Sequence, residues 1–229
     1  MTVSTETLTG VHKAMASTMA ASWSEIPHFA EIVQVDATAL KERLRTEREA
    51  LAGDANAPRI SINDLVVHAA IEALGREPAL NGVFVDGKIE RPDNVSVAVA
   101  IATDHGLMTP VLKDAASLTL KEISSSIVAL REAADRRRLG AEAFEGAVMT
   151  ISNLGAYGVD TGFPTINRRQ SALLFVGSLA DRPVVIDGEV VARPTMYLTL
   201  ACDHRVVDGL TAARYLAALR SIIERETGA

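Results

Sequence analysis

The chain is most constrained by a largely apolar run near its C-terminus that leads directly into a polar turn. Residues 196–201 suit a buried strand, and residues 203–209 read Asp-His-Arg-Val-Val-Asp-Gly. An aspartate before glycine suits a helix start, because its side chain accepts hydrogen bonds from amides of the first turn. The segment therefore predicts a strand, a turn that carries His204 beyond the sheet edge, and a helix that starts at Asp208.

Length and composition fit one large globular domain. The chain has 229 residues, of which 48% are hydrophobic, and a single core stops growing near about 250–300 residues. Its 23 basic and 29 acidic residues give a net charge of −6, which argues against a nucleic-acid partner. No apolar run approaches the ~20 residues of a membrane-spanning helix, and residues 1–9 lack a signal pattern. We therefore expect a cytoplasmic protein with neither a nucleic-acid nor a membrane partner.

Cysteine and histidine usage argues against a metal site. Cys202 is the only cysteine, which excludes a disulfide framework and a multi-cysteine metal site. No two histidines have the spacing of metal ligands. Apart from His204, the histidines are His12, His28, His68 and His105. We expect no metal, and we interpret His68, beside an apolar helix face, as structural.

Helix caps and apolar spacing predict several helices. Capping boxes are expected where Ser61 precedes Asp64 and where Thr119 precedes Glu122, because each pair can satisfy two free amides of a first turn. After Asp208, apolar residues at 212, 216, 219 and 223 share one helix face. Two more helices are expected at residues 11–22 and 38–51.

Strands and hairpins are predicted between these helices. Apolar residues at 95, 97, 99 and 101 alternate with small ones, which predicts a strand between two environments. Asp86-Gly87 and Asp187-Gly188 lie between short apolar runs and predict hairpins. Further strands are expected at residues 29–36, 147–152, 172–176 and 196–202. The mixture predicts an α+β fold, with a mixed sheet flanked by helices rather than a doubly wound parallel sheet.

The turn at residues 203–209 resembles the active-site motif Asp-His-Arg-x-x-Asp-Gly of dihydrolipoyl acyltransferase cores of 2-oxo acid dehydrogenase complexes. Chloramphenicol acetyltransferase shares that fold, but its motif has His-His in place of Asp-His. Four further segments resemble family landmarks in family order: Gly10–Met15, Ile26–Phe29, Ala102–Val111 and Thr150–Gly155. The resemblance covers nearly the whole chain, is strongest to the acetyl-transferring type, and implies a chloramphenicol acetyltransferase-like two-layer sandwich.

The chain departs from the family pattern at three places. His12-Lys13 stands where the family has Arg-Lys, and Asn167-Arg168-Arg169 stands where it has Asn-Pro-Pro. Residues 224–229 lack the Leu-rich tail with which family members dock trimers into large cages. The last departure leads us to expect a discrete trimer.

The resemblance implies transfer of an acyl group, most simply acetyl, between a dihydrolipoyl thiol and coenzyme A. A free thiol has a pKa of about 8.5 and is mostly protonated at neutral pH, so a neutral imidazole that removes its proton assists attack. The family pattern assigns this general-base role to His204 and stabilisation of the oxyanion to Ser152. Asp208 is expected to cap the turn and to support catalysis through an ion pair with the opening helix, with Lys13 as a candidate partner.

The resemblance also implies cofactors and partners. Coenzyme A is the co-substrate, and the lipoyl group belongs to another domain or chain. In the resembled fold the histidine's own main-chain carbonyl holds one ring nitrogen as N–H, and the same is expected for His204. Because the family's histidine and serine come from adjacent subunits, a homotrimer with active sites at its interfaces is expected. Dehydrogenase and dihydrolipoyl dehydrogenase subunits are further expected partners. Residues 1–229 form the catalytic core, residues 1–8 a flexible arm, and lipoyl and peripheral-subunit-binding domains are absent from the chain.

Several alternatives stay open. The basic run Arg136, Arg137 and Arg138 is either a solvated helix end or a contact for the phosphates of coenzyme A. Cys202 and His204 lie two residues apart on one strand face, which raises a Cys–His nucleophilic pair. The chain could instead be a stand-alone acyltransferase for a small acceptor, or a non-catalytic trimeric scaffold. Branched-chain and succinyl groups compete with acetyl.

Overall fold

The computed structural model describes residues 3–55, 57–104 and 106–225. Residues 3–9, most of the arm expected at the N-terminus, are exposed and form neither helix nor strand. Residues 226–229, most of the C-terminal segment that lacks a Leu-rich tail, lie outside the described residues, as does His105. No described helix is both long and apolar enough to cross a membrane.

A mixed seven-stranded sheet is built around the long strand β11 (Glu189–Asp203). The strand order is β1-β11-β9-β8-β4-β7, with β10 paired to the first half of β11. Strands β8, β9 and β4 run parallel to one another, whereas β11 runs antiparallel to β9 and β1. The sheet strands are β1 (His28–Asp36), β4 (Val97–Val99), β7 (Val111–Leu112), β8 (Met149–Asn153), β9 (Ala172–Val176) and β10 (Ala180–Ile186).

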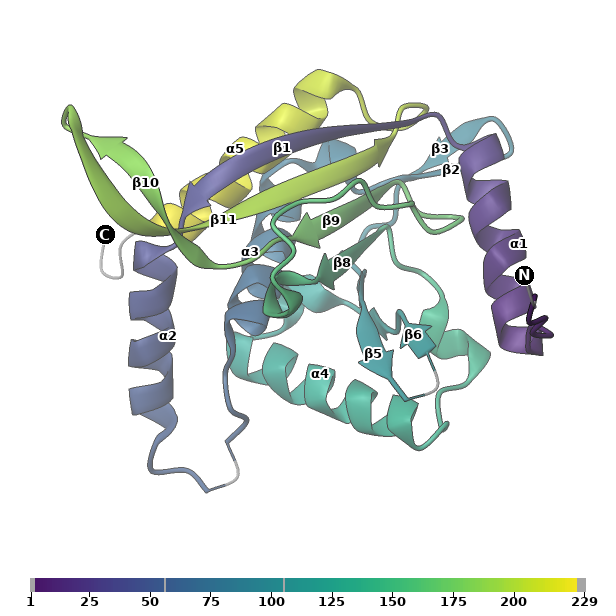
Figure 1. The fold of residues 1–229 in the computed structure, drawn as a ribbon, viewed down its shortest axis with the longest axis horizontal. Helices are drawn as coiled ribbons and strands as arrows, with labels where there is room; N and C mark the ends of the chain where they lie inside the picture. Colours follow the sequence, from purple (N-terminus) through teal and green to yellow (C-terminus); the bar gives the residue numbers. More distant parts are fainter. Residues whose placement is uncertain (1–2, 56, 105, 226–229) are drawn as a thin grey trace.

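Four helices contribute to the hydrophobic core on one side of this sheet; the last three cover the sheet, and the first extends away from its end (Figure 1). They are α2 (Thr38–Leu51), α3 (Ile62–Arg76), α4 (Leu120–Asp135) and α5 (Gly209–Glu224). The predicted apolar stripe of α5 is buried at all four positions, Ala212, Leu216, Leu219 and Ile223. Figure 1 shows α1 (Gly10–Glu25) standing apart at one end of the sheet. This arrangement confirms the α+β class with a mixed sheet and helices.

Short elements complete the fold. Two small hairpins are β2 (Val83–Val85) with β3 (Lys88–Glu90), and β5 (Ile101–Thr103) with β6 (Gly106–Met108). Single 3₁₀ turns are η1 (Pro78–Leu80), η2 (Ala115–Ser117), η3 (Ala141–Phe144) and η4 (Gly155–Tyr157).

The local signals in the sequence mostly specify the observed elements. Both capping boxes form, at the starts of α3 and α4. Both predicted hairpin turns form, and Asp86 and Gly87 adopt φ angles of 47° and 80°. Two positive φ angles in succession are what a tight two-residue hairpin turn requires. Helix α2 matches its predicted range, and α1 extends the predicted helix to Glu25.

The predicted continuous strand over residues 95–101 is wrong. The chain forms β4 and β5 as separate strands that belong to different sheets, with Ala100 between them. Strand β4 is also buried on both faces rather than between two environments. Its small residue Ala98 packs against Val111 and Ala147 on the face opposite the main core. Small residues therefore mark a second packed face here.

We predict that Leu174→Ala destabilises the chain by roughly 2–5 kcal/mol, because it leaves a cavity in a packed core. Leu174 lies on the buried strand β9 and has no exposed surface. Urea denaturation at a fixed chain concentration measures the loss. The control Val128→Ala removes methyl groups from a residue that is 47% exposed on α4, and it should change stability by less than about 0.5 kcal/mol. Equal losses in the two variants would contradict this placement of the core.

Candidate active site

His204 occupies the first turn position after β11, as the sequence predicts. Its backbone N–H donates to the carbonyl of Pro27 at 3.0 Å, which ties the turn to the start of β1. Its ring packs against the Phe29 ring, with 4.5 Å between centroids and 42° between planes. The side chain is exposed, and no other described residue hydrogen-bonds to the ring nitrogens. The imidazole is therefore accessible to a ligand.

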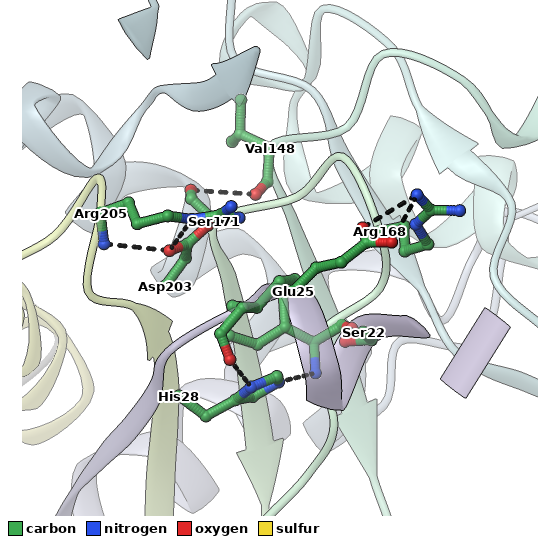
Figure 2. Close-up of polar contacts among 10 residues, drawn as sticks. Ser22, Glu25, His28, Val148, Arg168, Ser171, Asp203 and Arg205 are labelled. Atoms are coloured by element: carbon green, nitrogen blue, oxygen red, sulfur yellow. Dashed lines mark hydrogen bonds and ion pairs between the residues drawn. The ribbon is translucent and has the colours of Figure 1, made fainter. Parts of the chain in front are cut away.

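The turn around His204 is held by the buried carboxylate of Asp203. Asp203 is 1% exposed and accepts hydrogen bonds from the backbone N–H and the guanidinium of Arg205, at 3.0 and 2.7 Å (Figure 2). That guanidinium also lies 4.2 Å from the centroid of the Phe84 ring. A buried carboxylate needs such compensation, and Asp203 raises the pKa of Arg205 in return. In the sequence these residues stand out only as family markers, and no local signal predicts their role in the turn.

Asp208 begins α5 as its N-cap, which confirms the expected cap. Its carboxylate accepts a hydrogen bond from the backbone N–H of Thr211 at 2.8 Å. This donor lowers the pKa of Asp208, and the nearby His204 contributes a smaller effect of the same sign. The described ion pairs of the single chain do not join Asp208 to Lys13, whose side chain is exposed. The expected ion pair with the opening helix is thus absent within one chain.

Ser152 lies on β8, on the sheet face opposite the helices. Its neighbour Ile151 points into the main core, and successive strand residues point to opposite faces. Thr150 shares the face of Ser152 and accepts a hydrogen bond from Asn167 at 2.9 Å. Thr150 also donates to Gln170 at 2.6 Å. Ser152 is half-buried, and its hydroxyl has no hydrogen-bond partner among the described residues.

The sheet register keeps Ser152 and His204 apart within one chain. Phe175 of β9 is paired with Ser152 on one side and with Thr199 of β11 on the other. His204 follows Thr199 by five positions, or ~17 Å along the strand, and two strand spacings add ~10 Å across the sheet. The two side chains therefore lie on the order of 20 Å apart, and one chain cannot bring both to the same reacting group.

The loop after Ser152 is packed tightly against the sheet. Arg182 donates to the carboxylate of Asp160 at 2.5 Å and to the carbonyl of Thr195 at 2.7 Å. Ser178 also donates to Asp160, and this bond is the main reason why the pKa of Asp160 is lowered. A Cβ on Gly177 would lie 1.9 Å from the Asp160 carbonyl oxygen, so only glycine fits there. Sequence analysis missed this network.

The Cys–His alternative does not fit the structure. Cys202 has no exposed surface and belongs to the main core, whereas His204 is exposed beside Phe29. Burial raises the pKa of the Cys202 thiol far above its usual range. Because the thiolate is the nucleophilic form, Cys202 is unsuited to attack. Among the described residues, no cluster of three metal-ligating side chains occurs either.

The two arginine-rich segments lie in different places. Arg136, Arg137 and Arg138 are exposed at the C-terminal end of α4, where Arg136 pairs with Glu132 at 3.5 Å. Arg168 and Arg169 instead line a cavity of about 980 Å³ beside the β2–β3 hairpin, together with Arg205. Arg168 pairs there with Glu25 of α1 at 2.9 Å (Figure 2). The substitution of the family's Pro-Pro thus ties this loop to α1.

Comparisons with known proteins agree with the fold and show the family. The family model described as 2-oxoacid dehydrogenases acyltransferase (catalytic domain) matches residues 2–228. The chain is 34% identical over 214 residues to the dihydrolipoyllysine-residue acetyltransferase component of the pyruvate dehydrogenase complex from Rickettsia bellii, covering 93% of this chain and 51% of that protein. The chain thus spans about half the length of the curated relatives it matches.

Solved structures resemble the chain over nearly its whole length. A probable dihydrolipoamide acetyltransferase from Listeria monocytogenes superposes with a TM-score of 0.91 and 32% identity, covering 97% of this chain and 94% of that one. The Azotobacter vinelandii dihydrolipoamide acetyltransferase superposes with a TM-score of 0.90 and 28% identity, covering 97% of this chain and 92% of that one. That structure was solved to investigate a serine, a histidine and an asparagine in its catalytic mechanism. A chloramphenicol acetyltransferase shares the fold alone. It superposes with a TM-score of 0.55 and 13% identity, covering 90% of this chain and 94% of that one.

We predict that Asp208→Ala lowers the melting temperature, whereas Asp208→Asn retains the cap at neutral pH because asparagine caps helices equally well. The folded-state pKa of Asp208 lies below its ordinary value of 3.8. The stabilisation specific to its charge is therefore present above that value and is lost as the pH falls through the folded-state pKa. Melting curves should show the wild type converging on Asp208→Asn in acid. A gap that widens on acidification would contradict the cap's charged state.

Proposed function

The chain belongs to the family of 2-oxoacid dehydrogenase acyltransferase catalytic domains, and on this premise we propose that it transfers an acyl group between a dihydrolipoyl thiol and coenzyme A. The observation that carries the proposal is the turn after β11, where Asp203 and Asp208 hold an exposed imidazole in place. Residues 1–229 act as one catalytic core in this proposal.

The active site is proposed to form between two copies of the chain. Ser152 and His204 lie beside opposite ends of β9. A site that uses both therefore needs His204 from one copy and Ser152 from the next. The helix-free sheet face, which carries Ser152, offers a surface for this contact. Near this face, Trp23 of α1, Ile32 of β1 and Phe163 of the loop after β8 are 53%, 57% and 53% exposed, and large exposed apolar side chains that gather together mark interaction sites.

A closed ring of three copies satisfies this requirement. The contact joins two different surfaces, and such a heterologous contact must close into a ring or continue as a filament. The expected homotrimer is the small ring in which every copy gives one His204 and one Ser152. Most of the described side chains of α1 are exposed, so this helix is available to pack against a neighbouring copy. Light scattering should therefore give three times the chain mass of 24.3 kDa, and a mass above about eight such trimers would contradict the discrete trimer.

In the proposed mechanism, His204 acts as the general base. The neutral imidazole accepts the proton of the attacking thiol as its sulfur bonds to the acyl carbonyl carbon. The resulting oxyanion accepts a hydrogen bond from the Ser152 hydroxyl of the adjacent copy. The intermediate then expels the second sulfur, which takes the proton back from His204, so the enzyme returns to its starting state. General-base assistance of this kind contributes about 10²–10⁴-fold.

Substrates and partners follow from the same proposal. Coenzyme A is the co-substrate, the acyl carrier is a lipoyl group on another domain or chain, and no metal takes part. Arg136, Arg137 and Arg138 are the candidate contacts for the phosphates of coenzyme A. Dehydrogenase and dihydrolipoyl dehydrogenase subunits are the proposed protein partners. The proposed location is the cytoplasm, which suits a chain whose one cysteine is reduced and buried.

We predict that His204→Ala removes nearly all acyl transfer from acetyl-coenzyme A to free dihydrolipoamide, while the assembly keeps its mass. A spectroscopic assay of thioester formation measures the rate, with the branched-chain and succinyl donors run in parallel. Substantial activity in His204→Ala would contradict the general-base role. Transfer to a small acceptor but not to dihydrolipoamide would favour a stand-alone acyltransferase.

Ser152→Ala should lower kcat by about 10²–10³-fold, as loss of one oxyanion donor does. The KM values for both substrates should change much less, because the hydroxyl acts on the charge that develops in the transition state. Steady-state kinetics separate the two parameters. A pure KM defect would argue that Ser152 binds substrate rather than the oxyanion.

A further inference from the structure

The residue after Ser152 is fixed through both ends of its side-chain amide. The Asn153 oxygen Oδ1 accepts a hydrogen bond from the Gly155 backbone N–H at 2.9 Å. Its nitrogen Nδ2 donates to Oδ1 of Asn63 at 3.2 Å. Because a backbone N–H can only donate, the Gly155 contact determines which end of the Asn153 amide is oxygen. The Asn153 nitrogen then faces Asn63, so Asn63 must present its oxygen.

Asn63 presents this oxygen from a rigid position. It lies in the first turn of α3, between the residues of that helix's capping box. Asp64 is 5% exposed and accepts hydrogen bonds from the Ser61 backbone N–H at 2.8 Å and from the Ser124 hydroxyl of α4 at 3.0 Å. Two helices thus fix the backbone that carries Asn63, and its side chain is too short to move far.

The other side of the same segment is closed by backbone contacts. Leu154 donates its N–H to the Val176 carbonyl at 3.2 Å. A Cβ on Gly155 would lie 2.4 Å from the carbonyl oxygen of Gly177, so the chain passes close against the end of β9. The strand end that carries Ser152 therefore contacts α3 on one side and the segment after β9 on the other.

These contacts matter because they add to the pairing of β8 with β9 in fixing the strand end that carries the Ser152 hydroxyl. That hydroxyl has no hydrogen-bond partner among the described residues, so its location depends on the backbone at the end of β8. We infer that Asn63 is a positioning residue for Ser152: through Asn153, it fixes where β8 ends and hence where the hydroxyl meets the oxyanion. Asn63 touches no reacting atom. The inference rests on the proposed function and adds to it a residue from the helix layer.

The test is a double-mutant cycle between Asn63→Leu and Ser152→Ala. Leucine keeps the approximate volume but removes the acceptor. Asn63→Leu should lower kcat by roughly 5–30-fold, because small misplacements of a catalytic group are costly, and should leave KM within about twofold. In the Ser152→Ala background it should cause no further loss of kcat, because the group it positions is gone.

A second variant removes the other half of the same contact. Asn153→Ala removes the donor to Asn63 and the acceptor for Gly155 together; it should lower kcat at least as much as Asn63→Leu, and Asn63→Leu should cause no further loss in its background. Amide hydrogen exchange gives a readout that needs no activity: the Gly155 amide should exchange faster in both variants. The matched control is Asn81→Leu, since Asn81 bonds the carbonyls of Pro92 and Asn94 instead. It should lower the melting temperature but leave kcat unchanged.

The outcomes separate the two levels of the proposal. An equal fold-loss from Asn63→Leu with and without Ser152 would mean a merely structural role and would overturn the inference. So would unchanged kcat in Asn63→Leu where Ser152→Ala is strongly impaired; the proposed function would then stand. If the wild type transfers no acyl group, or Ser152→Ala is fully active, the proposed function itself fails and the positioning role fails with it.

Discussion

The opposite directions of β8 and β11 on the two sides of β9 determine what the molecule can do. Strand β8 runs parallel to β9, and β11 runs antiparallel to it. The C-terminal ends of β8 and β11 therefore lie beside opposite ends of β9. Ser152 stands near one of these ends and His204 just beyond the other. A chemical step that needs both must therefore combine two copies, so in the proposed function association is a condition of catalysis.

Each of the two strand ends, at Ser152 and before His204, is held by its own polar contacts. Beside His204, the buried Asp203 carboxylate holds the turn through Arg205, and Asp208 starts the helix that follows. Beside Ser152, the amides of Asn63 and Asn153 fix the strand end. Preorganisation of this kind lets a donor meet a developing charge without rearranging. The backbones that carry the exposed imidazole and the half-buried hydroxyl are thus held in place.

Local signals predicted the fold well, and long-range contacts were the part they could not supply. The caps at Ser61 and Thr119 and the turn at Asp86 are specified within a few residues, so sequence alone placed them. The break at Ala100 depends on which strands lie beside β4, and the sequence of residues 95–101 does not contain that information. The motif around His204 predicts the general base, whereas the partnership of Asn63 and Asn153 joins residues far apart in the sequence and carried no local signal.

Mixed assemblies of two inactive chains test the shared active site most directly. Chains with His204→Ala and chains with Ser152→Ala, carrying different tags, would be co-expressed and the mixed species purified. In a closed trimer that contains both kinds of chain, about one in three interfaces pairs an intact His204 with an intact Ser152, so the purified mixed species should regain about one third of wild-type transfer. Recovery at this level, from parents that are each nearly inactive, is the predicted result. A mixture no more active than its parents would contradict an active site built from two copies.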